Sequence, residues 1–353
     1  CAIYLTPIRA SCIDKCQYEE ISMSNEQMDI IGMGAALVDV FADVTDADLD
    51  KLNMPKGAMT LIDTEASKAL LDQISVHTST AGGSAANTIA GTASLGMSSG
   101  FIGKIANDTF GDVFAGDLSA MNIRLFGQPL NNDTPTGKCI VLVTPDAERT
   151  MNTLIGAAAF ITPEDLDENV LKETKAFFAE GYLFDSPQGA ETFFKACDIA
   201  HSGGGKVVLS LSDSFCVERH LDTFNKALAG PVDMVMSNDA EAKAMFGGAS
   251  IQDRVAAMQQ KNIDGVITRS ADGAVIVMSN DVTEIAAETV DRPVDLTGAG
   301  DQFAAGFLSG IALGKSMENA GRRGAVAAAE VIKHVGPRPQ VSLQDLIASA
   351  NLA

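Results

Sequence analysis

The sequence predicts an α/β fold with a mostly parallel sheet and helices on both of its faces. Short apolar runs rich in β-branched residues alternate with stretches of helical periodicity along most of the 353 residues. Strands that alternate with helices in this way are joined by right-handed crossovers. The composition agrees, because 32 glycines and few aromatic residues (16 Phe, 3 Tyr, no Trp) suit closely packed helices on a sheet. With 46% hydrophobic residues, the chain can bury a large core.

Six apolar runs are predicted to be strands of that sheet. They are Asp29–Gly32, Gly100–Gly103, Ala176–Ala179, Lys206–Leu211, Val232–Ser237 and Gly265–Thr268. Helical periodicity predicts helices at Ser84–Leu95, Asp108–Met121, Gln188–His201, Asp239–Phe246 and Ile251–Gln260. Beyond residue 300 the pattern is helical almost throughout.

Two stretches break the alternation. One lies at about 37–63 and contains two strand-like runs, Val38–Val44 and Ala58–Ile62, with no strong helix between them. The other, at about 130–155, contains two further runs on either side of a turn. Both predict antiparallel hairpins inserted into the α/β scaffold. We expect the two inserts to pair into one small sheet, which forms a lid over a site in a domain of residues 28–345.

The charge balance excludes whole classes of partner. The chain carries 25 Lys and Arg against 46 Asp and Glu, a formal net charge of -21. No basic stripe is present to release counterions from phosphates, so neither nucleic acid nor an anionic membrane is expected as a partner. A small anionic ligand stays compatible with this charge, because a few backbone N–H groups can hold it. No apolar run approaches the ~20 residues that span a bilayer, and we expect a cytoplasmic protein.

The cysteines and the first residues carry no site. Three of the six cysteines, Cys1, Cys12 and Cys16, fall in the first sixteen residues. There is no CxxC pair and no histidine at ligand spacing, so reduced thiols are expected and zinc is not. Residues 1–27 lack the apolar core of a signal peptide and precede the first convincing strand. We expect them to be an extension outside the fold.

The strongest chemical signal is the run DLTGAGD at residues 295–301. A glycine-rich turn leads directly into a helix, whose free N–H groups and positive dipole end form an anion site. Asp301 lies in the first helical turn, where its carboxylate can accept a proton from an attacking hydroxyl. An ordinary capped helix start is the alternative. The ordered GAGD, with Asp295 six residues before Asp301, favours the functional interpretation.

This run resembles the C-terminal signature of the PfkB (ribokinase-like) family of carbohydrate and nucleoside kinases, and the resemblance extends over about residues 28–340. It implies a ribokinase-like doubly wound sheet with a small β-sheet lid. It also implies ATP-dependent phosphorylation of a primary hydroxyl, with Mg²⁺ as cofactor. In the family the last Asp, here Asp301, is the general base, and the amides of Gly298, Ala299 and Gly300 hold the transferring phosphoryl group. The sequence departs from the family pattern at Leu296, where Thr is usual, but the base and the amides are present.

A second segment, AGGSAAN at 81–87, resembles the N-terminal signature of the family. The resemblance implies that Gly83 and Asn87 contact hydroxyls of a ribose or sugar. The residues agree, because paired glycines permit close backbone approach and Asn offers both donor and acceptor to a diol. The segment is also a helix start that Ser84 can cap. Asp39 matches an early Asp of the family that binds two sugar hydroxyls, and a carboxylate can accept from both.

Two further segments match the nucleotide side of the family. Asn238 and Glu241 form its Asn-x-x-Glu motif, which organises Mg²⁺ and the ATP phosphates, often through water. Oxygen ligands and bound water suit this ion. A capped helix with an exposed Glu is the local alternative, but the motif follows a predicted strand, at the end where α/β sheets bind ligands. Thr268, Ser270 and Gly273 resemble the nucleotide-binding turn.

Arg149 lies in the second insert and matches a lid arginine that reaches the transferring phosphoryl group in nucleoside kinases of the family. A guanidinium spreads its donors over the developing charge. A solvated hairpin charge is the alternative interpretation. Asp295 and Thr297 correspond to positions that line a monovalent-cation (K⁺) site in some relatives, and the sequence leaves open whether K⁺ is required.

Two other nucleotide-binding motifs are excluded. The run GMG at 32–34 half-matches a dinucleotide fingerprint, but Leu37 stands where a third small residue is needed, which disfavours a Rossmann oxidoreductase. The run GKS at 314–316 lacks the first glycine of a P-loop, because Ser309 occupies that position. We therefore expect phosphate to be bound by the GAGD run.

The identity of the acceptor stays open. The runs TGKC at 136–139, ER at 148–149 and LIGAA at 154–158 resemble adenosine kinases more than fructokinases or ribokinases. Adenosine, phosphorylated to AMP, is therefore the favoured substrate, and a ketose or ribose is the second candidate. A non-catalytic sugar- or nucleotide-binding regulator on the same fold is the third, disfavoured because Asp301 and the anion turn are intact. The sequence does not distinguish a monomer from a homodimer.

Overall fold

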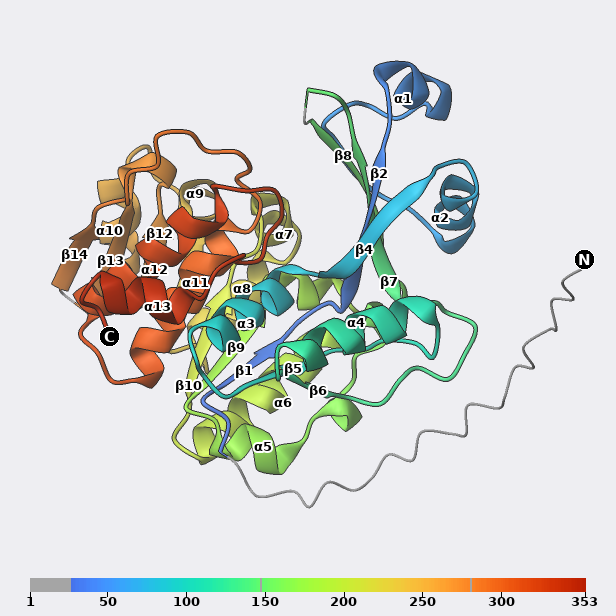
Figure 1. Ribbon diagram of the computed structural model, residues 1–353. Helices are drawn as coiled ribbons and strands as arrows, with labels where there is room; N and C mark the ends of the chain where they lie inside the picture. Colours follow the sequence, from blue (N-terminus) through green and yellow to red (C-terminus); the bar gives the residue numbers. More distant parts are fainter. Residues whose placement is uncertain (1–26, 147, 280) are drawn as a thin grey trace, which may run out of the picture.

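The computed structural model describes residues 27–146, 148–279 and 281–353. Its main body is a large sheet with helices on both faces, and a smaller sheet projects from that body (Figure 1). Residues 1–26, which hold Cys1, Cys12 and Cys16 and most of the expected extension, lie outside the described residues. Among the described residues, no helix combines the length and the apolar character needed to cross a membrane.

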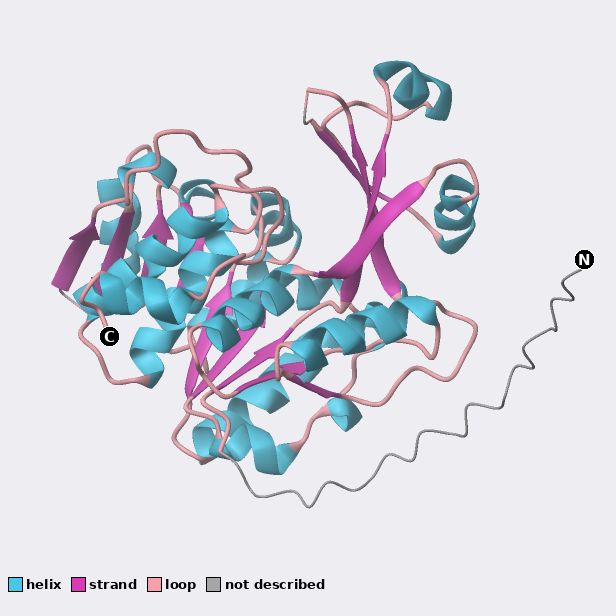
Figure 2. Ribbon diagram, in the orientation of Figure 1, coloured by secondary structure: helices cyan, strands magenta, loops and turns pink. Residues whose placement is uncertain are grey.

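The large sheet has nine strands within the described part of the chain. They are β1 (Ile30–Met33), β5 (Ser99–Ile102), β6 (Arg124–Phe126), β9 (Ala176–Glu180), β10 (Lys206–Ser210), β11 (Met234–Asn238), β12 (Gly265–Thr268), β13 (Ala274–Met278) and β14 (Asp281–Ile285). Their order is β14-β13-β12-β11-β10-β9-β1-β5-β6. Neighbours from β6 to β12 are parallel, and β13 and β14 are antiparallel additions at one edge. Figure 2 shows the resulting α/β arrangement, with strands in magenta.

The six predicted strands are confirmed as β1, β5, β9, β10, β11 and β12, with ends that agree to within two residues. Three strands of this sheet were not predicted. The first, β6, has three residues at the sheet edge, too few to show a periodicity. The other two, β13 and β14, follow β12 without an intervening α-helix, so the alternation that revealed the parallel strands is absent there.

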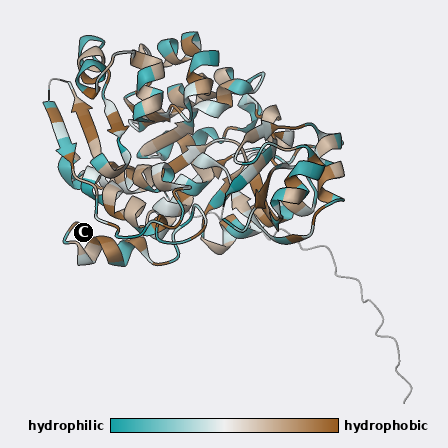
Figure 3. Ribbon diagram, turned by 90° about the horizontal axis from the view of Figure 1, so that it is seen from above, coloured by the Kyte–Doolittle hydropathy of each residue, from teal (hydrophilic) through white to brown (hydrophobic). Residues whose placement is uncertain are grey.

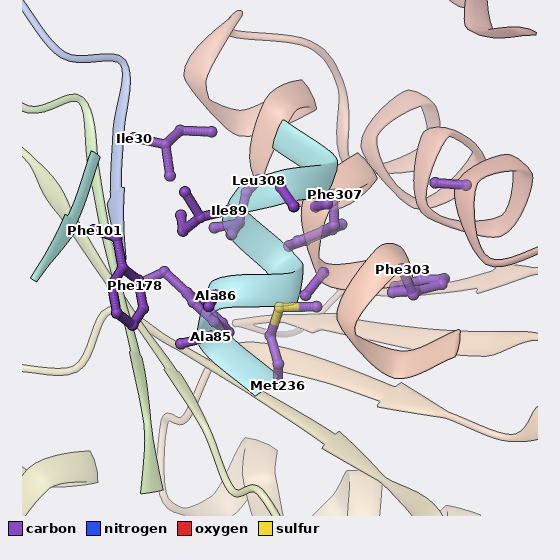
Figure 4. Close-up of a cluster of buried hydrophobic side chains, with 14 of the residues drawn as sticks. Ile30, Ala85, Ala86, Ile89, Phe101, Phe178, Met236, Phe303, Phe307 and Leu308 are labelled. Carbon is purple, nitrogen blue, oxygen red and sulfur yellow. The ribbon is translucent and has the colours of Figure 1, made fainter. Parts of the chain in front are cut away.

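Alternate residues of each strand face opposite sides of the large sheet and build two cores. Ile30 and Phe178 belong to one buried cluster, while their neighbours Ile31 and Phe177 belong to the other. Because both faces are covered, the strands read as continuous apolar runs. Figure 4 shows the first cluster, where side chains of β1, β5 and β9 meet Ile89 and Leu308 from two helices.

The helices divide between these two faces. The first core is covered by α3 (Ser84–Ser94), α4 (Thr109–Ala120), α11 (Ala299–Ala312), α12 (Met317–Val331) and α13 (Leu343–Ser349). The second is covered by α5 (Glu168–Glu173), α6 (Gly189–Ser202), α7 (Ser214–Arg219), α8 (Leu221–Leu228), α9 (Asp239–Phe246) and α10 (Ile251–Gln260). Figure 3 shows apolar and polar residues alternating along the helical ribbons, as expected for helices with one buried side.

The smaller sheet contains both inserts, but its strands pair differently from the prediction. Its strands are β2 (Leu37–Asp43), β3 (Met59–Leu61), β4 (Val76–Gly82), β7 (Gly137–Val143) and β8 (Arg149–Leu154), in the order β3-β8-β7-β2-β4. The second insert is an antiparallel hairpin, β7 with β8, as predicted. The first insert is not a hairpin: β2 pairs with β4 and β7, and β3 pairs with β8.

Two elements explain why the first insert was misinterpreted. A helix, α1 (Asp46–Leu52), separates β2 from β3, but only Leu49 of it is buried, so it leaves almost no apolar period. The partner strand β4 is mostly polar and exposed over its first half, so it lacks the alternation that marks a strand. The lid sheet therefore extends to residue 82, beyond the expected boundary of about 63, and includes α2 (Thr64–Leu71) between β3 and β4.

At the other end of the chain, the packed structure continues past residue 345, where the domain was expected to end. Residue 345 falls inside α13, and Leu352 beyond it is 2% exposed. Its carbonyl oxygen accepts a hydrogen bond from Arg323 of α12. The last turn of the chain is therefore part of the first core.

Candidate active site

The glycine-rich turn lies at the N-terminus of α11. Gly298 is the N-cap residue, with φ of 80°, a left-handed conformation that favours glycine. A Cβ at Gly298 would lie 2.6 Å from the backbone of Pro337, so the turn has no room for a side chain there. The situation at Gly300 is the opposite, because a Cβ there would meet nothing within 4 Å. The side of the turn at Gly300 is therefore open.

Asp301 follows this turn and is bound by two side chains of α3. Ser84 Oγ donates to Asp301 Oδ1 at 2.7 Å, and Asn87 Nδ2 donates to Asp301 Oδ2 at 3.3 Å. Burial raises the pKa of Asp301 to about 6, and the two hydrogen bonds oppose that shift. The two predicted signatures, more than two hundred residues apart in the sequence, thus meet at one carboxylate. Ser84 was expected to cap α3, but Gly83 is the N-cap residue and Ser84 binds Asp301 instead.

The paired glycines of the first signature have separate roles. Gly82 lies beside Asp39 of β2, and a Cβ on Gly82 would lie 2.3 Å from Asp39 Oδ2. Gly83 has φ of 93° and passes the carbonyl oxygen of Ala35 so closely that a Cβ would lie 2.5 Å from it. The absence of both side chains lets the start of α3 approach the Asp39 carboxylate.

The charge of Asp301 influences the ionisation of Asp39. Burial raises the pKa of Asp39 to about 6, the charges of Arg338 and Arg149 lower it, and the charge of Asp301 raises it. These four groups come from β2 and β8 of the smaller sheet, and from α11 and the segment after α12 of the main body.

Glu180, the last residue of β9, was missed in the sequence. It is 1% exposed, and its two carboxylate oxygens accept from the backbone N–H groups of Ala35 (2.8 Å) and Ala85 (2.7 Å). Burial raises the pKa of Glu180 to about 7. It fixes the turn after β1 against the start of α3. The signal for it was a Glu at the carboxyl end of an apolar strand, where α/β sheets carry their functional groups.

The segment Gly336–Arg338 was also missed, and each of its three residues contacts the site. The N–H of Gly336 donates to Asp295 Oδ2 at 2.8 Å, and the carbonyl of Pro337 accepts from Gln302 Nε2 at 3.0 Å. Arg338 Nε donates to Asn87 Oδ1 at 3.3 Å. The segment follows α12 as irregular backbone, so neither periodicity nor a motif indicated it.

On the predicted nucleotide side, Asn238 and Thr268 end the neighbouring strands β11 and β12 and are register partners. Asn238 caps α9 and forms a capping box with Glu241. Thr268 Oγ1 donates to the carbonyl oxygen of Ser237 at 3.3 Å, and Ser270 and Gly273 follow in the turn that leads to β13. Both Ser270 and Gly273 have positive φ, 53° and 77°, which makes this turn tight. The structure thus brings the predicted nucleotide residues together at the carboxyl ends of β11 and β12.

Glu241 fits a water-mediated role toward Mg²⁺ better than direct ligation. Its Oε1 and Oε2 both accept hydrogen bonds from Asn238. Burial raises the pKa of Glu241 to about 7, and the charges of Asp213 and Asp301 add to the rise, so a nearby cation would be stabilised. Within the described residues, no cluster of three or more His, Cys, Asp or Glu side chains could hold a metal ion. Mg²⁺ bound mainly by phosphates and water needs no such cluster.

Asp295 and Thr297, the predicted monovalent-cation residues, both contact Arg149 of the lid sheet. Arg149 donates to Thr297 Oγ1 at 2.9 Å and forms an ion pair with Asp295 Oδ2. Asp295 also accepts from the N–H and Oγ1 of Thr297 and from the N–H of Gly336. Burial acts to raise the pKa of Asp295, but these hydrogen bonds and the Arg149 charge hold it below its usual value. With its oxygens engaged and its charge neutralised, Asp295 does not fit a K⁺ ligand in this conformation.

The family of the chain follows from comparison with known proteins. The model of the pfkB family carbohydrate kinases matches residues 57–343. The chain belongs to this family. PfkB kinases transfer phosphate to hydroxyl acceptors, and the fold is that of their ribokinase-like structures: an α/β kinase with mixed sheets flanked by helices.

Individual PfkB relatives cover nearly the whole chain. Adenosine kinase from Saccharomyces cerevisiae is 27% identical over 332 residues, 87% of this chain and 96% of that protein. The structure of adenosine kinase from Sinorhizobium meliloti is 36% identical with a TM-score of 0.85, over 92% of this chain and 99% of that one. A probable sugar kinase from Rhizobium etli is 35% identical with a TM-score of 0.86, over 93% and 99%. These relatives support an adenosine-kinase-like or sugar-kinase-like PfkB enzyme, with ATP as the donor that the family implies.

Proposed function

We propose that this PfkB kinase transfers the γ-phosphoryl group of ATP to the 5′-hydroxyl of adenosine, which yields AMP. The observation that carries the proposal is the position of Asp301. It lies at the start of α11, beside the open turn at Gly300, and is held by Ser84 and Asn87. A base beside a set of free helix N–H groups suits an alcohol attacking a phosphate.

Asp301 acts as the general base. Its pKa of about 6 leaves the carboxylate mostly ionised at pH 7, yet more basic than an exposed Asp. It takes the proton of the acceptor hydroxyl while the hydroxyl oxygen forms a bond to the γ-phosphorus. The bond from that phosphorus to the bridging oxygen of ADP breaks, and ADP leaves with the electron pair.

The turn before Asp301 binds the transferring phosphoryl group. The N–H of Ala299 donates to the carbonyl oxygen of Leu296 at 3.2 Å. The N–H of Gly300 lies in the first turn of α11, where it has no partner within the helix. This N–H group and the dipole of α11 favour negative charge at this point. The open space at Gly300 lets a phosphoryl oxygen approach the backbone, and Gly298 provides the left-handed turn.

The hydroxyls of the acceptor are bound by Asp39, Gly83 and Asn87. The nucleotide is bound by Asn238, Thr268, Ser270 and Gly273. Mg²⁺, when bound with ATP, neutralises phosphate charge, and Glu241 would hold it through water. Arg149 contacts the turn at Thr297 and has further N–H donors for the phosphoryl group while it stays paired with Asp295. A guanidinium stabilises charge on the transferring group. No step is assigned to a monovalent cation.

Adenosine is favoured over a sugar because sequence and structure comparisons both include adenosine kinases along most of the chain. A sugar kinase is the second candidate, which the similarity to the Rhizobium etli protein supports at almost the same identity. The two candidates share the donor and the base and differ in the acceptor alone.

A panel of acceptors tests the proposal. The purified protein is incubated with MgATP and adenosine, ribose or fructose, ADP release is followed, and products are identified by mass spectrometry. We expect AMP, with kcat/KM for adenosine at least about tenfold above that for either sugar. A higher kcat/KM for a sugar would replace adenosine by that sugar. Nucleotide or sugar binding without any phosphoryl transfer would favour the regulator.

A matched pair of variants tests the base. We expect Asp301→Asn to lower kcat by about 10³-fold or more while it retains folding and ATP binding, because the amide cannot accept the proton. Asp198→Asn, an exposed Asp of α6, is the control and should keep full activity. Near wild-type turnover by Asp301→Asn would remove Asp301 from its role.

A further inference from the structure

Arg338 lies where its charge can reach two carboxylates of the site, although no predicted role involves it. The charges of Asp117 and Asp39 act on Arg338, and the charge of Arg338 in turn lowers the pKa of Asp39. Asp117, on α4, is itself held by Thr80 Oγ1 (3.0 Å) and the N–H of Ala81 (2.7 Å). The guanidinium thus contacts α3 through Asn87 and lies within electrostatic reach of carboxylates on β2 and α4.

The contact of Arg338 with Asn87 fixes the orientation of that amide. The Nε–H of Arg338 is a donor only, so Asn87 must present its Oδ1 to it. The NH₂ group of Asn87 must then face the other way, and there it donates to Asp301 Oδ2. Without Arg338, the Asp301 carboxylate alone holds the amide in this orientation.

We propose that Arg338 is a positioning residue of the kinase site, which holds the Asn87 amide toward Asp301 and supplies positive charge to the Asp39 carboxylate. The proposal rests on the proposed function for the roles of Asp301 and Asp39, but not on which hydroxyl compound is the acceptor.

The pattern of contacts separates Arg338 from a purely structural arginine. Arg323, also buried, donates from Nε to Ser309 Oγ and from Nη1 to the carbonyl of Leu352, both inside the first core. Arg338 instead has its hydrogen bond with a site residue, and within the described residues its buried Nη2 has no hydrogen-bond partner. Its guanidinium is therefore not placed by packing contacts alone.

The other charged groups that act on this site are mostly carboxylates. The charge of Asp301 raises the pKa values of Asp39, Glu180 and Glu241. Asp301 itself faces the uncharged donors Ser84 and Asn87. The cations whose charges reach Asp39 are Arg338 and Arg149, and Arg149 is paired with Asp295. Removal of Arg338 thus leaves Asp39 less stabilised as an anion, and it leaves the Asn87 amide that donates to Asp301 less firmly held.

The test compares Arg338→Gln, Arg338→Lys and Arg323→Gln with the wild type, each with the acceptor that the wild-type enzyme phosphorylates fastest. Readouts are kcat, separate KM values for acceptor and ATP, the pH dependence of kcat/KM for the acceptor, and the melting temperature. Using the wild-type enzyme's own best acceptor keeps this test separate from the proposed function. If the wild-type enzyme phosphorylated a sugar faster than adenosine, that result would refute the proposed function and leave this test intact.

For Arg338→Gln we expect kcat/KM for the acceptor to fall by about tenfold or more, with KM for ATP changed by less than about threefold. Loss of the cation raises the pKa values of the carboxylates. The acidic limb of the pH profile, where kcat/KM for the acceptor rises with pH, should therefore move to higher pH by about 0.5 unit or more. Arg338→Lys keeps the charge but not the fixed Nε–H, so its limb should stay near that of the wild type while kcat falls. Arg323→Gln should lower the melting temperature and leave the limb in place.

Three results would overturn the proposal. The first is an unshifted limb with an unchanged acceptor KM in Arg338→Gln. The second is an equal shift in Arg323→Gln. The third is a shift in Arg338→Lys as large as that in Arg338→Gln, because charge would then not be the cause. As a further check, Arg338→Gln should cost much less in kcat on an Asn87→Ala background, and full additivity would contradict a role through Asn87.

Discussion

Arg149 of the lid strand β8 forms an ion pair with Asp295 of the glycine-rich turn. The same guanidinium donates to Thr297 Oγ1, two residues further along that turn. The lid sheet is thereby joined to the start of the helix that carries Asp301. Both side chains are largely buried, at 16% and 10% exposure, so water screens the pair less than an exposed one. The position of the lid is therefore coupled to the glycine-rich turn.

Replacement of Arg149 should affect both catalysis and lid closure. We expect Arg149→Gln to lower kcat by about tenfold or more, because the turn loses its lid contact and the phosphoryl group loses a cation. Hydrogen exchange in β7 and β8 should become faster. Lys56→Gln is the control, since Lys56 is a lid cation paired with exposed Asp46 and Asp146 away from the turn. If Lys56→Gln reproduced both effects, lid charge in general would be responsible.

The Arg149–Asp295 pair also predicts how the enzyme responds to monovalent cations. Since the Asp295 carboxylate is neutralised by a guanidinium, exchange of K⁺ for tetramethylammonium at constant ionic strength should change kcat by less than about twofold. Steady-state rates in the two salts check this. Strong activation by K⁺ would mean that Arg149 leaves Asp295 during turnover and that a cation takes its place. The same exchange in Arg149→Gln shows whether the vacated carboxylate acquires a K⁺ dependence.

The two signatures at 81–87 and 295–301 predicted helix starts, which the structure confirms, because short motifs place a turn and a helix start together. Their partners could not be predicted in the same way. Glu180 ends an apolar strand, and its two N–H donors are 145 and 95 residues away in sequence. Arg338 meets Asn87 across 251 residues of chain. Contacts of this kind depend on how α3, β9 and the end of α12 pack, which no local pattern encodes.

The same distinction holds for the fold. Strands buried on both faces, such as β1 and β9, are continuous apolar runs and were predicted to within a residue of their bounds. The strand β4 is exposed along its first half, and α1 buries only Leu49. Hydrophobic periodicity reports burial, so elements of the lid that bury little leave little signal.

The two glycines of the turn should respond differently to alanine. Gly298→Ala places a Cβ against Pro337 at a φ of 80°, and it should destabilise the protein by about 1–3 kcal/mol. Gly300→Ala meets no neighbour, so the unfolding free energy should be unchanged or slightly raised. Its methyl group would nevertheless occupy the space offered to a phosphoryl oxygen, and kcat with MgATP should fall by about tenfold or more. Denaturant unfolding and kinetics together test the pair, and a fully active Gly300→Ala enzyme would contradict the anion role.

Burial raises the pKa of Asp301, and the hydrogen bond from Ser84 lowers it. With Asp301 as the proposed base, kcat/KM for the acceptor should rise with pH through a midpoint near the pKa of about 6. In Ser84→Ala the ion loses its 2.7 Å donor, its pKa rises, and the midpoint should move upward by about 0.5 unit or more. Ser119→Ala on the exposed side of α4 is the control and should leave the midpoint in place. A midpoint that stays fixed in Ser84→Ala would mean that another group limits the acidic side.

Buried carboxylates should make the protein less stable as the pH rises from about 5 to 7. Asp39, Glu180, Glu241 and Asp301 all have folded-state pKa values of about 6 to 7, above those of an unfolded chain. In this window the folded state binds more protons than the unfolded state, so the free energy of unfolding falls with increasing pH.

Glu180→Gln removes one of these groups and should flatten the slope, although loss of an acceptor for Ala35 or Ala85 lowers stability at every pH. Glu191→Gln, exposed on α6, should leave the slope unchanged. Urea unfolding at pH 5.5, 6.5 and 7.5 measures the slope, and equal slopes for Glu180→Gln and the wild type would show that Glu180 does not titrate there.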